Sequence, residues 1–159
     1  MSSNRHEACE FDYFCKMEIR QLSVDDYDVL VALWERSVRS SHDFLREEDF
    51  EFYKSRLASQ YFPNVELWGM VDEMRIAGFI GLSDMIEMLF VDPDFQGHKI
   101  GSTLLDFATN RKGMTRVDVN EQNSRALGFY LSKGFKISGR LPEDYAGKPY
   151  PILTLEMEG

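Results

Sequence analysis

The residues from Gln96 to Gly101, QGHKIG, stand between an apolar stretch and a run with helical spacing. A strand that ends in a glycine-containing turn and then starts a helix leaves several backbone N–H groups without partners. Together with the positive end of the helix dipole, those groups form a site for an anion such as a phosphate. Gly97 and Gly101 would let the backbone approach that anion closely. An ordinary tight turn would use the same residues, so the loop alone leaves both interpretations open.

Two other positions carry groups that could move a proton. Glu87 is the one charged residue in the apolar stretch MIEMLFV, where a carboxylate is costly unless it is paired or serves chemistry. It could accept a proton from an ammonium group, or it could face outward and pair with a Lys or Arg. His42 is the rival base because histidine titrates near neutral pH. A helix cap or a packing role is the alternative for His42.

The elements that would position these groups follow from the spacing of apolar residues. A strand is expected from Met17, and Ser23 with Asp26 forms a capping box before the first helix. A hairpin, VELWGMV and RIAGFIGLS, precedes the strand that contains Glu87. The remaining expected elements are a second helix within 43–61, a helix after the QGHKIG loop, a strand at 115–119, a helix at about 123–133 and two last strands, FKISGR and PILTLEM.

The order is therefore strand, two helices, three strands, helix, strand, helix and two strands. It predicts one mixed α/β domain over residues 17–159. The middle section, strand–loop–helix–strand, has the layout of a βαβ unit with a parallel strand pair. Residues 1–16 match no regular period, so we expect them to form a mobile extension.

Composition argues against several classes of function. Acidic residues outnumber basic ones by 27 to 18, and the net charge is −9. A nucleic-acid binder usually has a basic patch, and the sequence contains no Lys/Arg cluster that would form one. No apolar run approaches the roughly 18 residues of a membrane span, and the first residues do not read as a signal peptide. We therefore expect a cytoplasmic protein. Cys9, Cys15 and three scattered histidines lack zinc-site spacing, so no metal is expected. A homodimer stays open.

Two motifs together resemble those of the GCN5-related N-acetyltransferase (GNAT) superfamily. The signature loop of that family reads Gln or Arg, two variable residues, Gly, one variable residue, and Gly or Ala. Gln96 and Gly101 fit it, and Lys99 stands where the family has its middle glycine. The stretch NSRALGFYLSKGF fits the family pattern N-x-x-A-x-x-F-Y-x-x-x-G-F at Asn123, Ala126, Phe129, Tyr130, Gly134 and Phe135.

The resemblance covers residues 17–157. The segments HDFL (His42–Leu45) and GKPYP (Gly147–Pro151) are similar to segments of small bacterial acetyltransferases within the superfamily. The resemblance implies the acyl-CoA N-acyltransferase fold. It also implies transfer of an acetyl group from acetyl-coenzyme A to a primary amine of a small molecule or peptide, by direct attack on the thioester.

Such a transfer needs a neutral amine, a stabilised oxyanion and a protonated leaving thiolate. The resemblance implies that Tyr130 is the general acid, since a neutral phenol can protonate a thiolate at cellular pH; Glu87 is the candidate base. Asn123 would bind the cofactor, cap its helix, or do both. The implied cofactor-binding residues are the backbone of Leu89, Phe90 and Val91, the loop residues Gln96, Gly97, His98, Lys99, Ile100, Gly101 and Ser102, and the helix residues Asn123 and Tyr130.

From positions in the sequence, we expect the acceptor site to be lined by His42, Asn120, Tyr145 and Tyr150. The sequence does not identify the acceptor, because enzymes of this superfamily act on antibiotics, amino acids, polyamines and protein termini. The alternative function is a non-catalytic coenzyme A sensor. The departure at Lys99 favours the sensor, and the joint presence of Tyr130, Asn123 and Glu87 argues against it.

Overall fold

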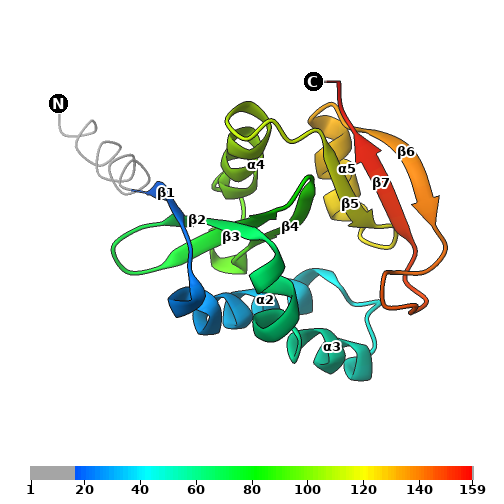
Figure 1. The fold of residues 1–159 in the computed structure, drawn as a ribbon, viewed down its shortest axis with the longest axis horizontal. Helices are drawn as coiled ribbons and strands as arrows, with labels where there is room; N and C mark the ends of the chain where they lie inside the picture. The colour runs from blue at the N-terminus through cyan, green and yellow to red at the C-terminus, as the bar shows by residue number, and fades with distance from the viewer. Residues whose placement is uncertain (1–16, 159) are drawn as a thin grey trace.

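A seven-stranded mixed sheet runs through the chain in the order β1-β2-β3-β4-β5-β7-β6 (Figure 1). This computed structural model describes residues 17–158, so the expected mobile extension at 1–16 lies outside the described residues. The strands are β1 (Glu18–Gln21), β2 (Glu66–Val71), β3 (Ile76–Leu82), β4 (Ile86–Val91), β5 (Arg116–Asn120), β6 (Lys136–Leu141) and β7 (Ile152–Glu156). The helices are α2 (Tyr27–Ser41), α3 (Glu47–Lys54), α4 (Ile100–Asn110) and α5 (Ser124–Ser132).

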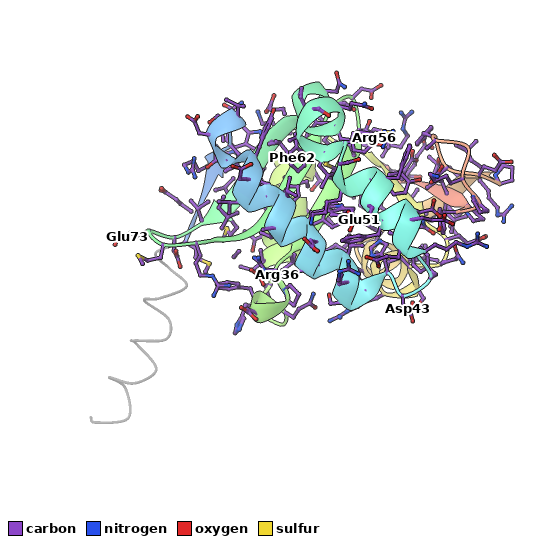
Figure 2. All side chains as sticks on the ribbon, turned by 90° about the horizontal axis from the view of Figure 1, so that it is seen from below. Arg36, Asp43, Glu51, Arg56, Phe62 and Glu73 are labelled. Atoms are coloured by element: carbon purple, nitrogen blue, oxygen red, sulfur yellow. The ribbon has the colours of Figure 1, made fainter. Side chains whose placement is uncertain are left out.

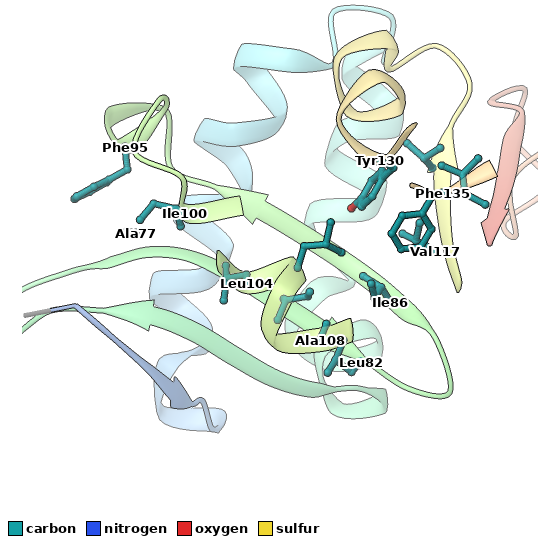
Figure 3. Close-up of a cluster of buried hydrophobic side chains, with 14 of the residues drawn as sticks. Ala77, Leu82, Ile86, Phe95, Ile100, Leu104, Ala108, Val117, Tyr130 and Phe135 are labelled. Carbon is teal, nitrogen blue, oxygen red and sulfur yellow. The ribbon is translucent and has the colours of Figure 1, made fainter. Parts of the chain in front are cut away.

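The helices cover the sheet in two layers, each with its own apolar cluster. Between the sheet and helices α2 and α3, the first cluster includes Leu30, Trp34, Phe62 and Phe79. The second cluster lies beneath α4 and α5 and is drawn in Figure 3; it includes Ile80, Ile86, Leu104, Val117 and Phe135. Because β3 separates the two layers, all seven of its residues are buried. The predicted mixed α/β fold class and its order of elements are confirmed.

The first helical region begins as the capping box predicts. The Ser23 N–H donates to Asp26 Oδ2 at 2.9 Å, and a short 3-10 turn at Val24–Asp26 leads into α2. The helix ends at His42, whose φ of −114° and ψ of 58° leave the helical region.

The second helix differs from the expected continuous helix within 43–61. α3 occupies only Glu47–Lys54, and a π-helical turn at Leu57–Tyr61 follows it. In that turn the Tyr61 N–H donates to Arg56 O at 3.1 Å. This hydrogen bond reaches back five residues, whereas an α-helical bond reaches back four. Leu57 and Phe62 are both buried, and we infer that the wider turn lets these two residues, five positions apart, face the same cluster.

The sheet opens between β4 and β5. These two strands are parallel, as the βαβ layout predicts, but they pair at a single register position, Ile86 with Val117. Beyond that position the strands diverge, and Figure 1 shows β5 turning away from β4. No helix within residues 17–158 is long and apolar enough to cross a membrane.

Candidate active site

Two cavities lie on opposite sides of β4. One is a groove of about 400 Å³ between β4, α4 and α5, lined by Leu89 and Val91 among others. The second is a cavity of about 700 Å³ toward α2, α3 and the β6–β7 loop, lined by Met88 and Phe90 among others. Neighbouring side chains on a strand point to opposite faces, so β4 forms a wall shared by both cavities.

A β-bulge places Glu87 on the larger cavity. In the ladder between β3 and β4, Met88 lies opposite Gly81 and Ile86 lies opposite Leu82. Glu87 is therefore the extra residue of the bulge, and it lines the same cavity as Met88 and Phe90. Bulges commonly re-aim a side chain beside a functional site. The Glu87 side chain is exposed, and its Oε1 accepts a hydrogen bond from Ser83 Oγ at 2.7 Å.

The loop before α4 has the geometry of an anion site. Gly97 has φ +83°, a region that glycine enters without steric cost. The first helical bond runs from the Thr103 N–H to Lys99 O, at 3.0 Å, so the N–H groups of Ile100, Gly101 and Ser102 belong to the unpaired first turn. All three residues line the groove. A groove with this glycine turn and helix end fits a long, anionic molecule.

Two loop residues depart from that arrangement. The exposed His98 does not line the groove, and its N–H donates to Phe95 O at 3.3 Å, so it is not free for an anion. Lys99 lines the groove with φ +61°, the only described residue besides glycines with a positive φ. For a side chain larger than glycine this conformation costs about 1–2 kcal/mol.

One edge of β4 faces the opening toward β5. In an antiparallel pair, the residues that bond the partner strand alternate. The Asp92 N–H donates to Ala77 O at 2.8 Å, so Leu89 and Val91 occupy the alternate positions, whose backbone groups point away from β3. Those groups can bond an extended molecule that lies along the groove.

Tyr130 projects from α5 into the second apolar cluster and lines the groove. Figure 3 shows its ring directed away from α5, with the hydroxyl at the tip. The side chain is only 5% exposed, and burial raises the pKa of its phenol. The rings of Phe129 and Phe135 lie 5.2 and 5.7 Å from it, centroid to centroid. The Tyr130 hydroxyl is therefore held in its neutral, proton-donating form.

Asn123 and His42 connect the two cavities. Asn123 caps α5, because its Oδ1 accepts from the Ala126 N–H at 3.1 Å. Its Nδ2 lies 3.5 Å from His42 Nε2. Asn123 lines the groove, while His42 lines the larger cavity.

Both ring nitrogens of His42 have polar neighbours. Its Nδ1 lies 2.7 Å from Ser41 Oγ, which itself lies 2.8 Å from Ser37 O. Its Nε2 faces the Asn123 amide. Burial lowers the pKa of His42 to about 4, against a small opposing effect of Asp43. The imidazole is therefore neutral at cellular pH.

Aromatic and carboxylate groups form the walls of the larger cavity. Asn120, Tyr145 and Tyr150, placed there by sequence position, all line it, as do Tyr53 and Asp144. Three hydroxyl–carboxylate contacts tether the β6–β7 loop around it: Tyr53 to Asp144, Tyr145 to Asp118 and Tyr150 to Asp49. The contact with Asp118, with some burial, raises the pKa of Tyr145 to about 12. Such a cavity suits an amine carried on an apolar chain.

Sequence reasoning missed two features of the site. Asp92, 1% exposed, accepts from Arg36 (2.7 Å) and Arg75 (3.2 Å) just before the loop; Figure 2 shows Arg36 on α2. Arg125 on α5 lines the groove and donates to Gln96 Oε1 at 2.5 Å. In the sequence, Arg125 could have been found as a site residue from its position between the motif residues Asn123 and Ala126. Within residues 17–158, no group of His, Cys, Asp and Glu side chains could hold a metal ion.

Comparison with known proteins supplies a family. The profile of a family described as "Acetyltransferase (GNAT) domain" matches residues 35–145, more than half of the chain. The chain is 39% identical to the peptidyl-lysine N-acetyltransferase YjaB of Escherichia coli K12 over 145 residues, which are 90% of this chain and 98% of that protein.

Solved structures agree with this match. The solution structure of apo YjaB from Escherichia coli has a TM-score of 0.82 at 39% identity, over 90% of this chain and 98% of that one. The PaiA N-acetyltransferase from Thermoplasma acidophilum, solved in complex with coenzyme A, has a TM-score of 0.69 at 23% identity, over 88% of this chain and 98% of that one. The second likeness supports the fold.

Proposed function

This chain belongs to the GNAT acetyltransferase family and is an acetyl-coenzyme A dependent N-acetyltransferase, and we propose that its acceptor is the side-chain amine of a lysine in a peptide or protein. The observation that carries the proposal is the 39% identity, over nearly its whole length, to an enzyme named for that acceptor. The larger cavity is compatible with it, because its aromatic walls suit a four-carbon stem and its carboxylates suit an ammonium head. The named relatives are enzymes, which removes support for the sensor alternative.

The residues of the smaller groove would hold the donor, which supplies an activated thioester. Gly97 and Lys99, with the first turn of α4, would bind its phosphates, and Gln96 would brace the loop. The open backbone positions of Leu89 and Val91 would bond its extended arm. The shared wall of β4 would then bring the thioester end next to the acceptor cavity.

Glu87 is the proposed base. The bulge directs it into the acceptor cavity, and its exposure connects it to water, so a proton taken from the lysine ammonium can leave to solvent. His42 is the proposed acceptor-positioning group. Its neutral Nε2 lies at the passage between the cavities and can accept a hydrogen bond from the amine.

Tyr130 is the proposed general acid for the leaving thiolate. It lines the donor groove, and burial keeps its phenol protonated. That hydroxyl can donate its proton where the thiolate would form.

Purified protein with acetyl-coenzyme A should release thiol when lysine-containing peptides are added, and mass spectrometry should find the acetyl group on the lysine Nζ. We expect Tyr130→Phe to lower kcat about a hundredfold, in the range of general acid catalysis, and to leave coenzyme A binding intact. Tyr27→Phe, which packs on Phe62 away from both cavities, is the matched control. Full turnover by Tyr130→Phe would refute the acid assignment. Turnover of free amines with no acetylation of peptides would refute the acceptor.

A further inference from the structure

The donor groove holds few cations for the anion that it must bind. Coenzyme A carries a diphosphate and a 3′-phosphate, and the chain itself has a net charge of −9. Among the residues that line the groove, the cationic ones are Lys99 and Arg125. A polyanion approaching an acidic protein depends strongly on such local positive charge.

Arg125 is held against the phosphate loop by a neutral partner. It lies in the first turn of α5, and its Nη2 donates to Gln96 Oε1 at 2.5 Å. A guanidinium has five N–H donors, and a glutamine side chain leaves its charge uncompensated. Other arginines of the described chain, such as Arg39 and Arg140, instead pair with carboxylates.

The helix that carries Arg125, α5, is held in place at two points. Asn123 caps its start, and Tyr130 anchors it in the apolar cluster. Arg125 is therefore presented from the wall that faces the loop and the first turn of α4. The bond to Gln96 orients the guanidinium across the mouth of the anion site.

We propose that Arg125 binds the diphosphate of coenzyme A and, with Lys99 on the opposite wall, forms a pair of cations that closes over the phosphate loop. Gln96 is then a positioning residue that acts through Arg125. The proposal rests on the use of acetyl-coenzyme A and not on the identity of the acceptor.

Titration calorimetry of the intact protein with coenzyme A, with no acceptor present, tests the proposal apart from the proposed acceptor. Arg125→Gln should weaken binding about tenfold or more, as expected for loss of a charge-assisted hydrogen bond, and should make the affinity less sensitive to salt. Arg111→Gln, an exposed arginine outside the groove, is the control and should bind normally. The melting temperature of each variant reports any loss of folding.

Two further variants separate charge from shape. Arg125→Lys should recover part of the affinity, and the exchange Gln96→Arg with Arg125→Gln should recover most of it, because it moves the cation to the other side of the same contact. Failure of both to recover affinity would overturn the proposal, as would normal binding by Arg125→Gln.

Dephospho-coenzyme A, which keeps the diphosphate and lacks the 3′-phosphate, identifies the phosphate. The expected result is the same loss in Arg125→Gln with either ligand. A loss seen with coenzyme A and absent with dephospho-coenzyme A would overturn the assignment to the diphosphate.

Discussion

At the scale of single residues, Lys99 holds a backbone conformation that a lysine rarely adopts. Lys99→Gly should raise the free energy of unfolding by about 1 kcal/mol, because glycine has no Cβ to strain at φ +61°. The same change should weaken coenzyme A binding, because it removes one of the two groove cations. Urea unfolding and calorimetry on the same preparation measure both effects.

The control for that experiment is Lys99→Asn, since asparagine tolerates the left-handed region and carries no charge. It should bind coenzyme A as weakly as Lys99→Gly. Tighter binding by Lys99→Gly would mean that the lysine only loosens the loop.

The neutral His42 predicts a loss of stability in mild acid. Its folded-state pKa of about 4 lies below the ordinary value of 6.5, so between these values the unfolded chain binds the extra proton more readily. The free energy of unfolding should therefore fall as pH drops from 6.5 toward 4. His42→Gln should show a smaller fall, measured by urea unfolding at pH 7.5 and pH 5.

Three carboxylates lie around His42: the charge of Asp43 opposes the lowering of the His42 pKa, and Glu87 and Asp144 line the same cavity. An equal fall in His42→Gln and wild type would contradict the prediction.

At the scale of elements, the turn before the phosphate loop depends on Asp92. Burial opposes ionisation of this carboxylate, but hydrogen bonds from Arg36 and from the Asp94 N–H outweigh it and hold its pKa below the usual value. We expect Asp92→Asn to destabilise the fold by about 2 kcal/mol, the loss of charged hydrogen bonds at a buried group. Asp94→Asn, at an exposed carboxylate that pairs with Arg75, should cost less than about 1 kcal/mol. Equal costs in urea unfolding would contradict this ranking.

Local patterns in the sequence predicted the elements better than their junctions. The capping box at Ser23 and the glycine loop are encoded within a few residues, so both could be read directly. The break after α3 could not, because the π-helical turn depends on burying Leu57 and Phe62 together. The bulge at Glu87 depends on the register with β3, which strand periodicity does not reveal.

At the scale of the whole molecule, the contacts that complete the site join distant parts of the chain. Arg125 meets Gln96 across 29 residues, and Tyr53 meets Asp144 across 91. Motif spacing placed Tyr130 and the loop, but it carries no information on such partners. The sequence therefore predicted some of the residues that surround the two cavities. It did not predict the hydrogen bonds between them.

The β4–β5 ladder joins the two halves of the sheet at a single register position. Its consequence should be visible in amide hydrogen exchange, which reports local opening. In the free protein the amides of Leu89 and Val91 should exchange much faster than those of Met88 and Phe90, because only the latter pair point toward β3. Uniform protection of all four amides would contradict this picture. A molecule bound along the open edge would protect the amides of Leu89 and Val91 and would hold the two halves of the sheet together. Exchange at these two amides would therefore report how firmly the two halves are joined.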